Sequence, residues 1–373
     1  MSKTIQNAPF RADIVGSFLR PQETKEARAK FERGEITAED LKKVEDKCIA
    51  ELVKKQKEVG LHVITDGEFR RSYWHLDFMW GLGGVKHIEL DHGYFFQGEE
   101  TTHGSLALTG KITGENHPFI EHFKFLKQFE TEGVVARQTI PAPAQFYAEL
   151  FREDNGKNTN AIYPDHEELI QDIASAYRTV IRDLVAAGCR NIQFDDCTWG
   201  MVCDTKFWKS MAGSGYDVET LKETYLRVNN LALEGRPEGV AINTHVCRGN
   251  YHSTWACEGA YDPVAKTLFV RENVDAFYLE FDDDRSGSFE PLALVPDGKK
   301  VVLGLITTKS PVLEDKKTVI SRIHEASKYI PLDRLCLSPQ CGFASCEIGN
   351  KLTEDEQWAK IRLVKEIADE VWK

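Results

Sequence analysis

Short runs rich in β-branched residues alternate with amphipathic helical stretches along most of this chain, and no other feature limits its fold as strongly. Strands that alternate with helices form parallel sheets, because each helix carries the chain back to the start of the next strand. Eight such units favour a closed (β/α)8 TIM barrel over an open doubly wound sheet, so the predicted fold class is α/β. The eight strands are expected at 12–17, 62–67, 134–140, 191–196, 240–247, 275–281, 301–306 and 335–339.

Helical periodicity fills several of the intervals between these strands. Thr37 begins the segment T-A-E-D, which resembles a capping box, and Asp165 is a second candidate for a helix start. Gly60 and Gly188 stand where these two helices are expected to end, since glycine commonly follows the last helical residue. The helices are expected at 37–60, 165–188, 217–234, 313–329 and 353–371.

Residues 78–133 break the alternation. They are rich in Gly, His and aromatic residues and contain alternating pieces such as HIELDHGYFF and SLALTGKIT. We expect a β-hairpin insertion after the second strand, which ends in a helix near 118–130 and helps to cover an active site. No linker rich in Pro, Gly or Ser divides the chain, so residues 1–373 are expected to form one barrel domain with this insertion.

Charge and cysteine usage exclude several classes of protein. The net charge of -12 argues against nucleic acid or an anionic membrane as the main partner. No apolar run approaches the length of a membrane span, and the N-terminus has no apolar segment typical of a signal peptide. The nine cysteines show no spacing typical of a secreted disulfide framework, which favours a cytoplasmic protein.

Candidate metal ligands lie at the ends of three predicted strands. His245 and Cys247 are two residues apart, so their side chains point to the same face of a strand. An H-x-C pair alone is more often a buried polar pair than a metal site. Glu280 ends the next strand and Cys341 follows the last one, and this set of thiolates, imidazole and carboxylate suits a catalytic zinc ion. Cys346 is a rival fourth ligand.

Six motifs in order give the chain a family resemblance. They are V-G-S-F, D-G-E, I-Q-F-D-D, H-V-C, a glutamate that ends a strand, and S-P-Q-C-G. From about residue 10 to 370 the chain resembles the catalytic C-terminal half of cobalamin-independent methionine synthase. The resemblance implies a zinc ion held by four residues, which are His245, Cys247, Glu280 and Cys341.

The same resemblance implies a substrate and a reaction. Ser17 matches a position that holds the amino-acid part of homocysteine, and Glu68 and Asp195 match acidic groups that bind its ammonium. Each carboxylate alone could equally be a helix N-cap or a solvated loop charge. Zinc would deprotonate the homocysteine thiol, which then attacks the methyl group of 5-methyltetrahydrofolate or a related donor. Glu280 is expected to detach as the thiol binds.

The chain departs from the family at three points. The second, N-terminal barrel of the full-length enzymes is missing, so the chain is expected to work as a compact catalytic barrel. The segment T-T-K-S places Lys309 where the family has a proton-donating histidine. Lys309 could donate the proton if a dry pocket lowers its pKa, or it could be a solvated lysine. TIPAPAQF lacks the tryptophan expected to stack on a pterin, for which Trp74 or Trp199 could substitute.

Two alternatives stay open at this point. The short relatives include zinc lyases that add the thiol of coenzyme M to epoxides, and Arg70, Arg71 or Arg248 could recognise its sulfonate. Glu68 and Asp195 favour an ammonium, and therefore homocysteine. The second alternative is a noncatalytic barrel with a structural zinc ion, which would need a closed site with no labile ligand.

Overall fold

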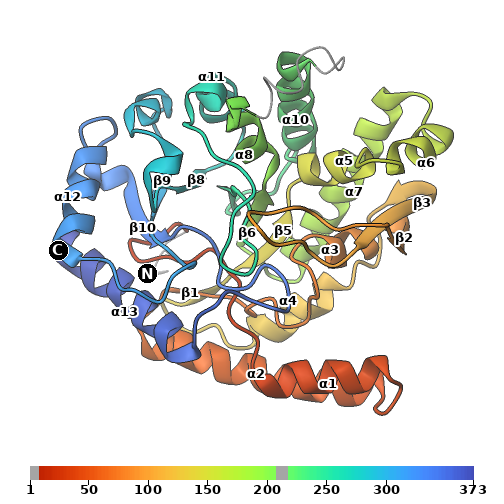
Figure 1. Ribbon diagram of the computed structural model, residues 1–373, viewed down its shortest axis with the longest axis horizontal. Coiled ribbons are helices and arrows are strands. Elements are labelled where there is room, and N and C mark those ends of the chain that lie inside the picture. The colour runs from red at the N-terminus through yellow and green to blue at the C-terminus, as the bar shows by residue number, and fades with distance from the viewer. Residues whose placement is uncertain (1–7, 207–216) are drawn as a thin grey trace.

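The protein, described here by a computed structural model that covers residues 8–206 and 217–373, is built on a parallel six-stranded sheet (Figure 1). Nearly every residue of these strands is buried, as is usual for parallel sheets covered on both faces. Neighbours in the sheet follow the reverse of the chain order, from β10 (Leu335–Pro339) through β9 (Lys300–Ile306), β8 (Ala276–Glu280), β7 (Ala241–Val246) and β6 (Asn191–Asp196) to β5 (Gln138–Pro141).

The remaining parallel contacts are short. β1 (Val63–Ile64) pairs with β4 (Val135–Ala136), which precedes β5 in the same extended segment. Ala12 bridges to Leu337 of β10, and Ser17 bridges to Gly67 after β1. The described chain therefore has an α/β arrangement that resembles a TIM barrel.

The strand predicted at 12–17 is wrong as a continuous element, because only its two ends pair. The carboxylate of Asp13 accepts the backbone N–H groups of Phe10 and Ile14, at 2.8 and 2.7 Å. Gly16 has φ of 153°, a conformation that favours glycine. The side chain of Asp13 thus binds a backbone N–H group that would otherwise donate to a neighbouring strand in a regular sheet.

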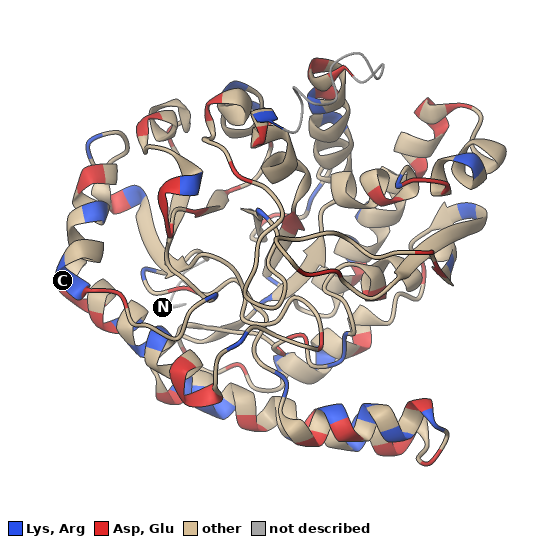
Figure 2. Ribbon diagram, in the orientation of Figure 1, with Lys and Arg blue, Asp and Glu red and all other residues tan. Residues whose placement is uncertain are grey.

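Helices surround the strands, and the five predicted ones are present. The capping box of Thr37 and Asp40 is confirmed. The side chain of Asp165 caps the second helix, because it accepts the backbone N–H of Glu167. In Figure 2 basic and acidic residues alternate along the outer helices at the bottom of the view, as expected for faces in contact with solvent. The five helices are α2 (Ala38–Glu58), α7 (His166–Ala186), α10 (Val218–Ala232), α12 (Lys316–Ala326) and α13 (Glu354–Val371).

The described residues contain six further α-helices that were not predicted. Most are short, and the longest of them buries only Thr24 and Ala27, so its apolar periodicity is weak. They are α1 (Gln22–Glu32), α3 (Leu76–Trp80), α5 (Pro143–Leu150), α6 (Asn155–Ile162), α8 (Thr198–Cys203) and α11 (Asp262–Arg271). In the described ranges, no helix combines the length and apolar character needed to cross a membrane.

The segment 78–133 contains the expected hairpin and helix. β2 (Gly83–Glu89) pairs antiparallel with β3 (Gly104–Thr113), and α4 (Phe119–Lys127) follows. The loop between the two strands, residues 90–103, is called the strap loop below. In Figure 1 it extends (orange) from the hairpin toward the centre of the view.

Hydrogen bonds hold both sides of the strap loop. On one side the guanidinium of Arg152 donates to the carbonyl of His92, at 3.2 Å. On the other side the N–H of Gln97 donates to the carbonyl of Trp255, at 3.2 Å. Glu99 adds an ion pair of 2.8 Å with Lys351. The loop therefore spans from the region of α5 and α6 to the segment that follows β7.

A buried carboxyl group makes stability depend on pH. Burial raises the pKa of Glu272 to about 8, because its charged form would lose hydration. Asn229 donates to Glu272 at 3.4 Å and to Asp196 at 3.1 Å, and the second oxygen of Glu272 has no hydrogen-bond partner. The folded state keeps a proton that the unfolded state releases above its ordinary pKa, so stability should fall as pH rises from about 4.5 to about 8.

Glu272→Gln is therefore expected to raise Tm by a few degrees at pH 8 and by much less at pH 5. The amide keeps the shape of the side chain and removes the cost of ionisation. Thermal unfolding of both proteins across this pH range provides the measurement. A Tm difference that does not change with pH would contradict the prediction.

Candidate active site

A cavity of about 940 Å³ lies where the parallel strands end. This volume is within the range of small-molecule sites. Asp195 and His245 reach it from β6 and β7, Cys247 directly follows β7, and Cys341 follows β10. The strap loop lines the same cavity with Tyr94 and its two aromatic neighbours, so the insertion forms part of the cavity wall.

The four predicted metal ligands come together at one edge of this cavity. One possible ligand atom from each residue lies within 4.8 Å of the others, and all four residues are buried. The sulfurs of Cys247 and Cys341 are 3.7 Å apart. Cys346 lines the cavity but does not belong to this group.

The polar atoms of the cluster fit a bound cation. Both ring nitrogens of His245 are buried without a hydrogen-bond partner, and so is one carboxylate oxygen of Glu280. The other oxygen of Glu280 accepts the N–H of Arg248 at 2.8 Å, which orients the carboxylate. The adjacent sulfur of Cys247, and then burial, raise the pKa of Cys341 well above its ordinary value. A divalent cation would offset the charge of two thiolates, and this donor set is typical of zinc.

Ser17 lies beside the chain that carries Cys341. Its hydroxyl oxygen accepts the N–H of Ala344 at 3.2 Å. A Cβ on Gly342 would collide with this hydroxyl, so glycine is needed for the close approach. The parallel bridge from Ser17 to Gly67 places it next to Glu68. The first and last strand regions therefore meet at this side of the cavity.

Glu68 and Asp195 form a buried acidic pair on the cavity wall. Glu68 accepts the hydroxyl of Thr139 at 2.9 Å and pairs with Arg71 at 3.2 Å, but its second oxygen has no partner. Burial raises the pKa of Glu68, and burial followed by the charge of Glu68 raises the pKa of Asp195 well above its ordinary value. Asp195 is the register partner of His245 in the sheet. A cation bound here would allow both acids to ionise.

Lys309 lies beside Glu280 of the candidate metal cluster. Its side chain is buried, so the reading as a solvated lysine is wrong, and it is not among the residues that line the cavity. Its Nζ lies 3.8 Å from Glu280 and 4.0 Å from Asp282. Burial opposes the charge, but the two carboxylates outweigh burial and raise the pKa of Lys309 above its ordinary value. The surroundings of Lys309 therefore do not lower its pKa, which was the condition for proton donation from this side chain.

The three arginines proposed to recognise a sulfonate are engaged elsewhere. Arg70 forms ion pairs with two carboxylates of α2. Arg71 pairs with Glu68, and Arg248 lies 4.4 Å over the ring of Tyr261. None of them is among the described residues that line the cavity.

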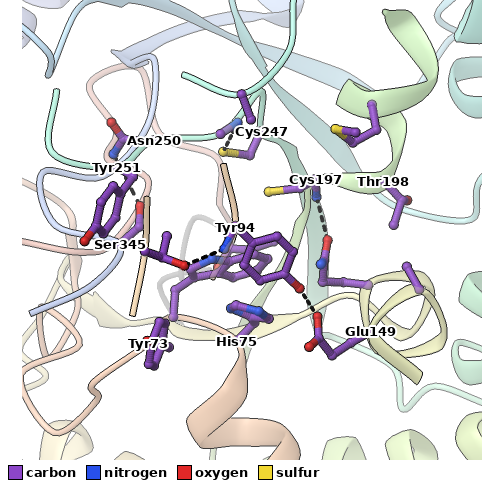
Figure 3. A pocket seen from close by; sticks show the side chains of 18 of the residues that line it. Tyr73, His75, Tyr94, Glu149, Cys197, Thr198, Cys247, Asn250, Tyr251 and Ser345 are labelled. Carbon is purple, nitrogen blue, oxygen red and sulfur yellow. Dashed lines mark hydrogen bonds between the residues drawn. The ribbon is translucent and has the colours of Figure 1, made fainter. Parts of the chain in front are cut away.

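Several cavity residues were missed by the sequence analysis. Figure 3 shows Cys197 near Cys247, with both sulfurs directed toward the cavity. Cys197 directly follows Asp196, the last residue of β6, so the reasoning used for Cys341 could have found it. Gln145 and Glu149 come from α5, which had no helix signal strong enough to place them. Of the two candidate tryptophans, Trp74 lines the cavity and Trp199 does not.

Known proteins share this sequence and fold. The uncharacterized protein YxjH of Bacillus subtilis (strain 168) is 45% identical over 369 residues, which cover 99% of this chain and 96% of the relative. A putative vitamin-B12 independent methionine synthase from Listeria monocytogenes, known as a crystal structure, superposes with a TM-score of 0.77 and 40% identity over 99% of both chains. A B12-independent methionine synthase from Shewanella sp. W3-18-1, solved with selenomethionine, has the same fold, with a TM-score of 0.72 and 19% identity over 98% of both chains.

More distant relatives are longer. The 5-methyltetrahydropteroyltriglutamate–homocysteine methyltransferase of Synechococcus sp. is 23% identical over 92% of this chain, and the match covers 41% of that enzyme. The family described as cobalamin-independent synthase, catalytic domain, matches residues 10–117 and 155–369. These matches confirm the TIM-barrel-like α/β fold class, and with it the family resemblance of the six motifs. The chain belongs to the cobalamin-independent synthase family, as a match to its catalytic domain.

Proposed function

We propose that the protein is a zinc-dependent homocysteine S-methyltransferase, which forms methionine with 5-methyltetrahydrofolate or a related compound as the methyl donor. One observation carries this proposal: a cluster of four possible metal ligands and a buried acidic pair lie at the same cavity. Homocysteine has a thiol at one end and an ammonium at the other. Its two ends match the two parts of the site.

At the thiol end, His245, Cys247, Glu280 and Cys341 would hold the metal. Bound zinc would supply the positive charge that keeps a substrate thiol in its thiolate form near neutral pH. Lys309 is placed to hold the carboxylate of Glu280 when the substrate thiol takes its position, because Nζ already lies 3.8 Å from it. This position favours a role for Lys309 at Glu280 over protonation of the methyl donor.

At the amino-acid end, Glu68 and Asp195 would bind the ammonium, and Ser17 would bind the amino-acid group. The free oxygen of Glu68 offers an acceptor for a charge-assisted hydrogen bond. Ser17 stands between this pair and the segment of Cys341, which would fix the distance between ammonium and sulfur.

The same proposal includes a closed (β/α)8 barrel in which residues 1–373 act as one catalytic unit. The bridges at Ala12 and Ser17 support closure, because they continue the parallel contacts beyond β10 and β1. The hairpin insertion would form part of the cavity wall.

Addition of coenzyme M to an epoxide is the second candidate that shares thiol activation. It needs a cationic group free to bind a sulfonate. Of the described arginines, Arg152 lines the cavity, and its guanidinium is 3.5 Å from both Glu149 and Glu153. The acidic pair at the thiol's polar end favours homocysteine. The cavity of this size beside the cluster argues against a noncatalytic zinc barrel, because a structural zinc ion needs no space for a substrate.

Zinc X-ray absorption tests the thiol half of the proposal. Adding homocysteine to the zinc-loaded protein is expected to add one sulfur neighbour and to remove one oxygen neighbour, that of Glu280. Methionine formation from homocysteine and a panel of donors, including 5-methyltetrahydrofolate and methylcobalamin, is measured on the same preparation. A spectrum unchanged by homocysteine would contradict thiol activation. A spectrum that gains sulfur while keeping every other neighbour would contradict only the release of Glu280.

A further inference from the structure

The cavity has a second acidic centre, formed by α5 and the strap loop. Glu149 of α5 is 1% exposed. The hydroxyl of Tyr94 forms a hydrogen bond to one oxygen of Glu149, and the hydroxyl of Ser105 donates to the other at 2.8 Å. In Figure 3 Tyr94 lies between Glu149 and the sulfurs of Cys197 and Cys247. This centre is therefore directed at the open part of the cavity, where a substrate beside the thiol would lie.

Glu149 is protonated near neutral pH. Burial raises its pKa to about 8, against the opposing effect of Arg152. The other groups around Glu149 do not lower its pKa. Glu153 adds a further raising effect, and Ser105 contributes a neutral hydroxyl. Burial, followed by the charge of Arg152, lowers the pKa of the nearby His75 to about 3, so this imidazole is neutral.

We propose that Glu149 and Tyr94 form the proton relay that protonates the leaving group of the methyl donor. This inference rests on the proposed function. The protonated carboxyl would donate its hydrogen to the oxygen of Tyr94, which leaves the hydroxyl hydrogen of Tyr94 free to point into the cavity. Tyr94 is therefore the group that would touch the donor, and Glu149 supplies its proton.

The need for a relay follows from the position of the other acids. Lys309 is held at Glu280, outside the cavity lining. Glu68 and Asp195 also have raised pKa values, but they belong to the end of the cavity that would bind the ammonium. An amine nitrogen that loses a methyl group is a poor leaving group unless it gains a proton. Glu149 is the described buried acid left for this task.

The atoms of the step balance. The sulfur–carbon bond forms as the carbon–nitrogen bond breaks, and the electron pair of the broken bond stays on nitrogen. Nitrogen takes the proton of Tyr94, and Tyr94 takes the proton of Glu149. The resulting carboxylate is stabilised by Arg152, whose guanidinium lies 3.5 Å from Glu149 and 3.7 Å over the ring of Tyr94. The proton gained by the donor equals the one that the thiol releases, so no further reactant is required.

Two methylating agents separate proton donation from binding and folding. 5-Methyltetrahydrofolate needs a proton on its leaving nitrogen, whereas methyl iodide releases iodide without one. Labelled homocysteine is incubated with the zinc-loaded enzyme and either agent, and methionine is measured from pH 6 to 9. The variants are Glu149→Gln, Tyr94→Phe and the control Asp154→Asn, which neutralises a carboxylate with 80% of its side chain exposed.

We expect Glu149→Gln and Tyr94→Phe to lower kcat with 5-methyltetrahydrofolate by about 10²-fold or more, and to leave the methyl iodide rate unchanged. In the wild-type enzyme the folate reaction should slow as pH rises through about 8, where Glu149 loses its proton, and this limb should vanish in Glu149→Gln. Asp154→Asn should behave as wild type. Equal loss with both agents would overturn the relay in favour of a structural contact, and so would full folate activity in Glu149→Gln.

The proposed function fails in a different way. If the wild-type enzyme does not accelerate the methylation of homocysteine by either agent over the rate without enzyme, the proposed function is wrong. The relay is then wrong as well, because it rests on that function. A wild-type enzyme active with methyl iodide and inactive with 5-methyltetrahydrofolate and every other amine donor would overturn the relay alone.

Discussion

Cys341→Ser is expected to abolish methyl transfer and to weaken zinc binding by at least ~100-fold, the upper range for loss of a group that only supports a metal ligand. Cys341 supplies one of two thiolates in a cluster whose four residues are all buried. A serine hydroxyl keeps its proton near neutral pH and is a poor zinc ligand. Zinc affinity is measured by competition with a chromophoric chelator, and activity by methionine formation.

Cys346→Ser is the matched control. It makes the same change five residues along the chain, at a cysteine that lines the cavity and stands outside the ligand group. This variant is expected to keep its zinc affinity. Equal weakening in both variants would mean that Cys346 shares in metal binding, and retention of zinc by Cys341→Ser would contradict the central assignment.

Asp195→Asn is expected to lower kcat/KM for homocysteine by roughly 30- to 1000-fold, since losing one partner of a buried charge pair costs about 2–4 kcal/mol. Asp195 is buried beside Glu68, and the amide removes the charge that a substrate ammonium would meet. Zinc affinity should stay unchanged, because the carboxylate does not belong to the ligand cluster.

A second thiol makes this test specific. 4-Mercaptobutyrate has the chain length of homocysteine and lacks its ammonium. Its reaction should be slow in the wild-type enzyme and should not slow further in Asp195→Asn. A similar loss for both thiols would show that Asp195 acts on the fold or on the metal cluster instead of the ammonium.

The strands and the metal cluster could be predicted because their signals are local. His245 and Cys247 share a face through the two-residue period of one strand. Glu280 and Cys341 join them because the carboxyl ends of parallel strands meet at one side of the sheet. The helix of Thr37 was recognisable for a similar reason, since its capping box lies within four residues.

Features that depend on distant partners were not predictable. The charge of Lys309 is set by Glu280 and Asp282, which stand on another strand and the loop after it. The raised pKa of Glu149 depends on burial by distant parts of the chain, and its hydrogen-bond partner Tyr94 lies 55 residues away in the strap loop. The strand predicted at 12–17 is interrupted because the side chain of Asp13 accepts nearby backbone N–H groups. The alternation of apolar and polar residues in the sequence does not reveal such a contact.

The parts of the chain proposed to meet the thiol and the methyl donor differ in how easily their residues can be replaced. The groups proposed to activate the thiol stand at strand ends, where a change of residue disturbs the core of the barrel. Tyr94 and its aromatic neighbours come from residues 90–103, between two strands of a hairpin outside the six-stranded sheet. Insertions and substitutions in such a loop are tolerated far better than in a buried strand. Evolution could therefore exchange one methyl donor for another by altering this loop, while the residues proposed to activate the thiol stay the same.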